Sequence, residues 1–269
     1  MKPKALVLQA HGTNRDLDVM DALTLAGADV IGIPLNDLRL NKTLFRDFQL
    51  VVLPGGFSYA DALGAGKLLA IDLISYFADE IAAFVEFGKP VIGICNGFQA
   101  LVKSGILPGT HIVAGSNEAD LRNDTGGATL TFNANGHFEC RWVSLKPISQ
   151  NCIWTKGLDE IINCPIAHGE GNFEIADPSL FSTFEAQDQI ALTYSCPDGS
   201  PANGNYPVNP NGSMFDIAGI CNPQGNVLGL MPHPENHIHA WQHPRYTRGE
   251  KGESGLALFE NGVRYANAL

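Results

Sequence analysis

The stretch that decides the fold is Val91-Ile92-Gly93-Ile94-Cys95-Asn96-Gly97-Phe98-Gln99. An apolar, β-branched run ends there at a cysteine and a helical pattern follows at once, which indicates a strand turning sharply into a helix. Glycines two residues before and two residues after Cys95 relieve crowding at such a turn, and this is the layout of a nucleophile elbow with sulfur in place of hydroxyl. Exposed amides at the start of the following helix favour thiolate over thiol. Most free cysteines are small buried thiols, but the flanking glycines favour a nucleophile.

Around the elbow, strand-like and helical segments alternate. We expect strands at residues 4–8, 30–33, 48–53 and 91–94, and helices from about residue 15 to 26, over 61–70 and over 74–87. The first helix should turn Leu17, Met20 and Leu23 inward. Such alternation predicts an α/β fold with a flavodoxin-like, doubly wound, mainly parallel sheet, in which ligands bind beyond the carboxyl ends of the strands. The third strand ends in the turn 54–58, so this turn and Cys95 should lie at the same edge.

The second half of the chain is less regular. Residues 116–137 are rich in Asn, Asp, Thr and Gly and suggest a loop or hairpin, and residues 195–213 form a long loop of Pro, Gly and Asn. We expect strands at 138–145, 190–194, 215–220 and 227–231, a short strand after residue 171 and a final helix over 254–266. Because no linker, repeat or low-complexity break appears, residues 1–269 are interpreted as a single domain that carries additional β-hairpin and loop insertions.

Composition limits the functional classes. The formal net charge of −11 and the pI near 5.1 argue against nucleic acid or an anionic membrane as the main partner. No apolar segment is long enough to span a bilayer, and the run after Lys4 stops at Gln9, too short for a signal peptide. Six cysteines without a CxxC pattern are typical of reduced thiols. A cytoplasmic protein is the expectation.

A thiol nucleophile needs a base within hydrogen-bond reach, and the base needs a group that orients it. His233 and Glu235 follow the expected strand at 227–231. Positions i and i+2 of an extended backbone project to the same side, so the carboxylate could fix the tautomer of the imidazole. A His-x-Glu pair alone more often decorates a surface; its place after a late strand, with a cysteine elbow upstream, favours a triad.

Gly55 and Gly56 could form a plain turn or an oxyanion hole. In the second interpretation the amide of Gly56 or a neighbour, together with the amide of Asn96, would stabilise a tetrahedral oxyanion. Gln99, one turn into the elbow helix, could contact substrate or merely bond to backbone.

Metal and nucleotide sites find little support in the sequence. The histidines at 233, 237, 239 and 243 match no standard zinc spacing, and no metal is expected. Gly66-Lys67 lacks the remaining residues of a P-loop, and no Gly-x-Gly-x-x-Gly opens a helix. No cofactor is expected in this chain, and any ATP should bind to another chain.

Several motifs together resemble a known family. Residues 93–99, the Pro-Gly-Gly-Phe-Ser-Tyr run at 54–59 and Met-Pro-His-Pro-Glu at 231–235 are similar to class I, triad-type glutamine amidotransferases. More narrowly, His-Gly-Glu-Gly at 168–171, Asn-Pro-Asn-Gly-Ser at 209–213 and the segment 254–261 resemble the glutaminase components of phosphoribosylformylglycinamidine synthases. The likeness runs from residue 9 nearly to the C-terminus.

The resemblance implies a chemistry and a set of residues. Cys95 would attack the carboxamide of glutamine to give a γ-glutamyl thioester and ammonia, His233 would move the protons, Glu235 would orient it, and water would then release glutamate. The substrate and the oxyanion would lie against residues of three segments: Gly55, Gly56, Phe57, Asn96, Gln99, His168, Gly169, Glu170 and Gly171.

The resemblance also implies partners. Ammonia would pass to a large synthetase subunit, which uses ATP and Mg²⁺ to convert formylglycinamide ribonucleotide to the amidine in de novo purine biosynthesis, and a small accessory subunit could join them. Starting at Met1 with its own first strand, the chain is expected to be the separate glutaminase subunit. Two departures lie where a partner would dock: Ala60 to Gly64 reads Ala-Asp-Ala-Leu-Gly rather than Gly-Asp-Tyr-Leu-Arg, and Asn236 replaces a basic residue.

Two rival interpretations remain. A cysteine hydrolase or chaperone of the same architecture also carries an elbow cysteine, but not the late His-x-Glu pair. A non-enzymatic binding or regulatory subunit would keep the fold alone and leaves the joint presence of thiol, base and carboxylate unexplained.

Overall fold

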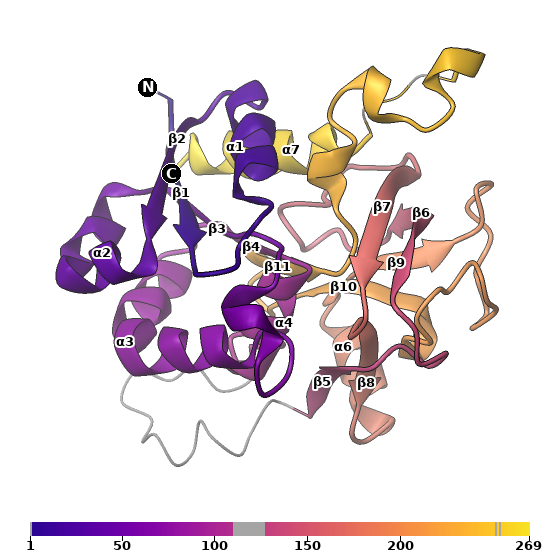
Figure 1. Ribbon diagram of the computed structural model, residues 1–269, viewed down its shortest axis with the longest axis horizontal. Helices are drawn as coiled ribbons and strands as arrows, with labels where there is room; N and C mark the ends of the chain where they lie inside the picture. Colours follow the sequence, from indigo (N-terminus) through magenta and orange to yellow (C-terminus); the bar gives the residue numbers. More distant parts are fainter. Residues whose placement is uncertain (1, 110–126, 251, 253) are drawn as a thin grey trace.

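The computed structural model describes residues 2–109, 127–250, 252 and 254–269. Its centre is a nine-stranded sheet in the order β2-β1-β3-β4-β11-β10-β9-β6-β7 (Figure 1). The first five strands in this order pair in parallel. They are β1 (Lys4–Gln9), β2 (Asp29–Pro34), β3 (Leu50–Leu53), β4 (Val91–Ile94) and β11 (Val227–Leu230). Every residue of β3, β4 and β11 is buried, as expected for strands covered on both faces. The predicted doubly wound parallel sheet is confirmed.

From β11 onward the sheet continues with antiparallel pairs. These strands are β10 (Ile217–Cys221), β9 (Ile190–Ser195), β6 (Glu139–Pro147) and β7 (Ile162–His168). The predicted insertions thus add strands to the main sheet. Because the direction alternates, β9 and β7 run the same way as β4, and their carboxyl ends return to the same edge as that of β4. A separate two-stranded sheet pairs β5 (Ala128–Thr131) with β8 (Asn172–Ile175).

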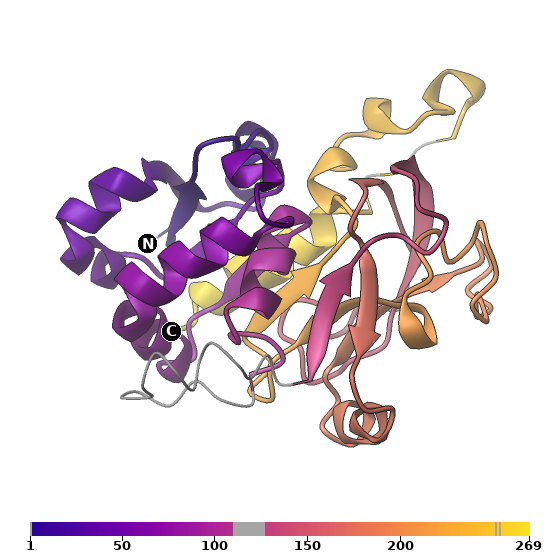
Figure 2. The same cartoon turned by 60° about the horizontal axis from the view of Figure 1, so that its bottom comes forward.

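Helices cover both faces of the parallel strands (Figures 1 and 2). Helices α1 (Asp16–Leu25) and α7 (Leu256–Ala266) contact each other on one face, and α3 (Lys67–Glu86) and α4 (Asn96–Lys103) contact each other on the opposite face. Shorter helices are α2 (Leu35–Leu40) and α6 (Ser179–Ala186). The final helix forms as predicted, although it begins at Leu256, and the loop predicted over 195–213 is present except that Ser195 ends β9. The part of the predicted loop at 116–126 lies outside the described residues.

The predicted pair of helices at 61–70 and 74–87 is wrong. A single helix, α3, spans Lys67–Glu86, since nothing in the Ile71-Asp72-Leu73 segment interrupts it. It begins late because residues before it are held in the left-handed region, among them Tyr59, Ala60 and Leu63 at φ 54°, 55° and 65°. The expectation for Leu17 is also wrong: it lies in the first turn of α1, at the carboxyl edge of the sheet, and is 74% exposed.

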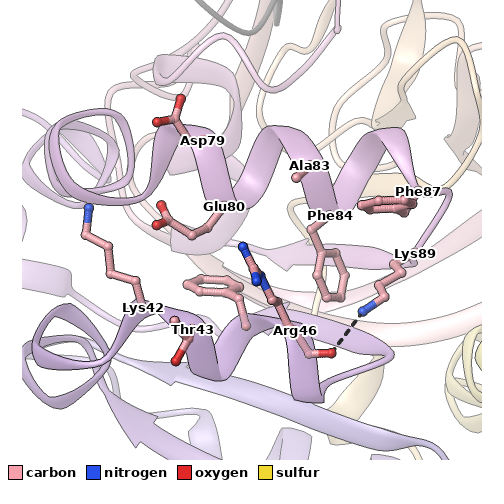
Figure 3. A pocket seen from close by; sticks show the side chains of 10 residues that line it. Lys42, Thr43, Arg46, Asp79, Glu80, Ala83, Phe84, Phe87 and Lys89 are labelled. Atoms are coloured by element: carbon pink, nitrogen blue, oxygen red, sulfur yellow. Dashed lines mark hydrogen bonds between the residues drawn. The ribbon is translucent and has the colours of Figure 1, made fainter.

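At the opposite edge lies a cavity of about 590 Å³ between α3 and the 3₁₀ turn η1 (Lys42–Asp47) (Figure 3). It is lined by the aromatic rings of Phe45, Phe84 and Phe87 and by charged side chains of both signs. Since η1 leads into β3 and α3 leads into β4, this cavity lies beside the amino ends of these strands. The nucleophile elbow is at their other end.

Candidate active site

Cys95 occupies the turn between β4 and α4, as the sequence predicts. Its backbone has φ 51° and ψ −105°. This conformation is energetically unfavourable for any residue other than glycine and persists only where the surrounding structure fixes it. The Cys95 amide donates a hydrogen bond of 2.8 Å to the carbonyl of Leu230 on the neighbouring strand β11. The buried thiol therefore projects from the carboxyl edge of the sheet at the start of a helix.

The two glycines of the elbow are required by close packing. A Cβ at Gly97 would lie 2.0 Å from the carbonyl oxygen of Leu53, and a Cβ at Gly93 would lie 2.5 Å from Cδ1 of Leu101. Helix α4 therefore lies directly on the backbone of β3 and β4, which aims its N-terminus at the thiol.

His233 and Glu235 follow β11, the strand next to β4. The Nδ1 atom of His233 lies 2.7 Å from Oε1 of Glu235, and both side chains are buried. The contact does not come from an extended backbone, as the sequence suggested, because residues 234–236 form the 3₁₀ turn η4 (Pro234–Asn236). This turn brings the carboxylate back onto the imidazole.

Gly55, at the end of β3, lies against both groups. A Cβ built there would be 2.7 Å from Cε1 of His233 and 3.4 Å from Cβ of Cys95. Only a residue without a side chain leaves room for the imidazole and the thiol side by side. The ends of β3, β4 and β11 thus converge on one point.

The charges at this point favour a protonated imidazole. Burial alone would lower the pKa of His233, but the carboxylate of Glu235 and the sulfur of Cys95 outweigh it and raise the pKa to about 10. Cys164 lies close by on β7, where burial and the charge of Glu235 hold its pKa well above the ordinary value. Cys164 therefore stays a thiol.

The Gly55–Gly56 peptide presents its N–H away from the turn that follows β1. The carbonyl of Gly55 accepts hydrogen bonds from the amides of Asn14 (3.4 Å) and Arg15 (3.3 Å), and in a trans peptide the N–H of Gly56 points the opposite way. The amide of Phe57 instead donates to the carbonyl of Gly12 at 3.0 Å, so it is occupied and does not fit the oxyanion role expected of residue 57. Gly56 and Asn96 are the remaining amides of the predicted oxyanion hole.

Asn96 and Gln99 have structural partners for their side chains. Nδ2 of Asn96 donates to Asp61 Oδ1 and to Gln99 Oε1, both at 3.0 Å, and its Oδ1 accepts from the amide of Ser58. Nε2 of Gln99 donates to the carbonyl of Glu170 at 2.6 Å, and Gln99 is 3% exposed. Of the two interpretations left open for Gln99, bonding to backbone is the one observed: it ties the elbow helix to the loop after β7.

That loop, residues 168–171, is organised by Asn133, which sequence reasoning missed. Nδ2 of Asn133 donates to the carbonyls of His168 and His137, both at 2.8 Å, and its Oδ1 accepts from the amide of Gly171 at 3.0 Å. These partners fix the orientation of the amide, so Nδ1 of His168, 3.1 Å from the same Oδ1, carries a proton. Burial and the neighbouring charge of His233 lower the pKa of His168 to about 3, and the ring is neutral.

The other loop residues are also held in place. A Cβ at Gly171 would lie 2.3 Å from Cε1 of His168, so the ring packs directly on the glycine backbone. The carboxylate of Glu170 accepts from the amide of Ala65 at 3.2 Å and lies 3.6 Å from Nζ of Lys103. Within the residues that the structure describes, no three His, Cys, Asp or Glu side chains converge as a metal site would require. Nor does any helix in that part of the chain have the length and apolarity to cross a membrane.

A mainly parallel sheet whose carboxyl edge joins an elbow cysteine to a His–Glu pair is the arrangement expected of a class I glutamine amidotransferase. A profile of the CobB/CobQ-like glutamine amidotransferase domain matches residues 2–266. The PurQ subunit of phosphoribosylformylglycinamidine synthase from Treponema denticola is 51% identical over 98% of this chain and 99% of its own length. The corresponding subunit from Methanococcus maripaludis is 37% identical over 98% of both chains.

Solved structures agree. A chain in the structure of PurLQS from Thermotoga maritima superposes with a TM-score of 0.70, at 32% identity over 98% of this chain and 99% of that one. A glutamine amidotransferase from the same organism, at 17% identity and a TM-score of 0.50, shares the fold. The chain belongs to the PurQ family of glutamine amidotransferases.

Proposed function

We propose that the chain hydrolyses glutamine through Cys95, His233 and Glu235. The observation that carries this proposal is the convergence of thiol and imidazole on Gly55, with Glu235 2.7 Å behind the imidazole. The sulfur of Cys95 attacks the carboxamide carbon, and the N–H groups of Gly56 and Asn96 bind the oxyanion that forms. His233 gives its proton to the departing nitrogen, ammonia leaves and a γ-glutamyl thioester remains.

The second half of the cycle uses the same groups. Neutral His233 takes a proton from a water molecule, whose oxygen attacks the thioester carbon. The tetrahedral intermediate collapses to glutamate and the Cys95 sulfur, and the imidazolium is restored. Glu235 keeps Nδ1 protonated and oriented throughout. The ordered loop 168–171 supports glutamine binding beside the thiol, with Glu170 held by Lys103 and Ala65.

The ammonia is proposed to feed the synthesis of phosphoribosylformylglycinamidine in a complex with a synthetase subunit and a small accessory subunit. Relatives that share 51% and 37% identity are named as subunits of that synthase, and a similar chain occurs in PurLQS. ATP and Mg²⁺ are proposed to bind to the synthetase, which converts formylglycinamide ribonucleotide to the amidine in purine biosynthesis. A cytoplasmic location is proposed from the six free cysteines.

Intact-mass analysis with peptide mapping tests the nucleophile. Incubation with 6-diazo-5-oxo-norleucine, a glutamine-like electrophile, should give one adduct on Cys95 that excess glutamine prevents. In the complex, Cys95→Ser should abolish synthesis from glutamine and spare synthesis from ammonium salts. Equal loss of both activities, or an adduct on Cys164, would overturn the assignment.

A further inference from the structure

The turn after β1, residues 11–15, contacts the end of β3 through backbone groups. The carbonyl of Gly55 accepts from the amides of Asn14 and Arg15, and the amide of Phe57 donates to Gly12. A further backbone hydrogen bond joins the same two segments: the amide of Tyr59 donates to the carbonyl of His11 at 2.7 Å. We propose that Gly12 and the turn at residues 11–15 are positioning elements, which orient the Gly55–Gly56 peptide so that its N–H can bind the oxyanion. This inference rests on the proposed function.

The orientation of that peptide decides whether it helps or hinders the reaction. With the carbonyl of Gly55 bound to residues 14 and 15, the N–H of Gly56 is directed to the opposite side. A reversed peptide would lose both hydrogen bonds and present a carbonyl dipole where negative charge develops. A donor contributes to catalysis only when it is aimed at the oxyanion before the reaction.

The approach of the two backbones requires glycine on both sides. A Cβ at Gly12 would lie 2.1 Å from the carbonyl oxygen of Phe57, and a Cβ at Gly56 would lie 2.7 Å from the amide nitrogen of Asn14. Contacts below 3.0 Å with backbone atoms force the backbone to move. A side chain at residue 12 would therefore displace the segment 55–57 without touching Cys95, His233 or Glu235.

The turn itself is well anchored, so it can hold another segment. The amide of Ala10 donates to Oγ1 of Thr13 at 3.2 Å, and the amide of Thr13 donates to the carbonyl of Ala10 at 3.1 Å. Nε2 of Gln9 donates to Asp16 at 2.7 Å, which fixes the turn to the start of α1. The start of α1 thus holds the turn, and the turn holds the Gly55–Gly56 peptide.

The test compares Gly12→Ala with Gly27→Ala in the assembled synthase. Both glycines have left-handed backbones, with φ 91° and 101°, and they flank the two ends of α1. A Cβ at Gly27 meets nothing within 4 Å, so Gly27→Ala introduces a similar backbone strain without the clash. For Gly12→Ala we expect kcat with glutamine to fall about 100-fold, the effect of losing one oxyanion donor, while KM for glutamine and ammonia-dependent synthesis change little. Gly27→Ala should stay within about twofold of the parent in all three.

A second variant separates the effect of backbone strain at residue 12 from the effect of displacing the segment 55–57. Asparagine adopts the left-handed region more readily than alanine but also carries a Cβ. Gly12→Asn should therefore lose kcat as Gly12→Ala does. Recovery in Gly12→Asn, equal behaviour of Gly12→Ala and Gly27→Ala, or parallel loss of the ammonia-dependent activity would each overturn the positioning role. Cys95→Ser reports separately on the proposed function: if it kept glutamine-dependent synthesis, the nucleophile assignment would fail whatever residue 12 does.

Discussion

The amide of Cys95 donates a 2.8 Å hydrogen bond to the carbonyl of Leu230. Leu230 is paired with Ile94 in the parallel register of β11 and β4. Cys95, the residue that follows β4, is thus bonded to the last residue of β11, the strand that leads to His233. The start of the elbow and the end of the strand that leads to His233 are therefore joined by a hydrogen bond of the sheet.

Gly55→Ala should abolish glutamine-dependent synthesis with little effect on folding. The added methyl group would lie 2.7 Å from Cε1 of His233 and would displace the imidazole from the thiol. We expect kcat/KM for glutamine to fall by at least about 100-fold, as for a misplaced catalytic group. Gly157→Ala is the control without a clash: its Cβ meets nothing within 4 Å, and its left-handed backbone (φ 75°) adds a strain that Gly55→Ala does not carry. Near-parental activity of Gly55→Ala would show that the imidazole does not act from its present position.

Glu235→Gln should lower activity and move its pH-dependence. The carboxylate and the sulfur of Cys95 raise the pKa of His233 to about 10 against the effect of burial, so removing the carboxylate lowers that pKa. The imidazolium is then lost at lower pH, and the alkaline limb of kcat/KM for glutamine should shift to lower pH. At neutral pH we expect a loss on the order of 10²- to 10⁴-fold. An unchanged alkaline limb would contradict the charge assigned to His233.

His168 should make the fold sensitive to acid. Its pKa is about 3 in the folded chain and 6.5 for an unperturbed histidine, so below pH 6.5 the unfolded chain binds a proton that the folded chain excludes. Stability is present above pH 6.5 and is lost as the pH falls from there towards 3. Between pH 7 and pH 5 the free energy of unfolding should fall by about 2 kcal/mol from this group. Urea unfolding of His168→Gln should lack this component; an identical loss in the variant would exclude His168 as its source.

Asn133→Ala should loosen the loop 168–171. The substitution removes the donor to the carbonyl of His168 and the acceptor for the amide of Gly171, and leaves buried polar groups unpaired. We expect a loss of about 1–3 kcal/mol in the free energy of unfolding and a raised KM for glutamine. The exposed Asn36 on α2 offers a control, since Asn36→Ala should change neither. An unchanged KM would separate this loop from glutamine binding.

The sequence predicts most of the parallel half of the fold and the elbow, because their signals are local. The apolar runs of β3 and β4, the flanking glycines and the turn after β11 each lie within a few residues of the group they position. The His233–Glu235 pair was also expected, although the 3₁₀ turn that forms the contact was not. The assignment of the triad to catalysis and the single-domain organisation stay predictions.

The remaining parts of the site depend on contacts between distant segments. Asn133 sits in a polar stretch that looks like ordinary loop, and its role appears only when β7 brings residues 168–171 beside it. Gly12 likewise reads as a turn residue until the carbonyl of Phe57 is seen against it. Helix α3 begins later than its sequence pattern indicates, because residues near Tyr59 adopt left-handed backbone conformations. Tertiary contacts override local helix propensity there.

The Gly55–Gly56 peptide, which carries the proposed oxyanion donor, is held differently from Cys95. Cys95 is fixed by a 2.8 Å bond of the sheet, whereas the Gly55 carbonyl is held by bonds of 3.3 and 3.4 Å from a turn. The side chain of Phe57, two residues away from Gly55, is 45% exposed at the same edge. A chain that docks at this edge can thus contact the segment 55–57, which carries the proposed oxyanion donor, while Cys95 stays buried. On the proposed mechanism, labelling of Cys95 and glutamine turnover measure two separable properties, the reactivity of the thiol and the alignment of the oxyanion donor. A subunit fully labelled by an electrophile can then still be inactive in turnover.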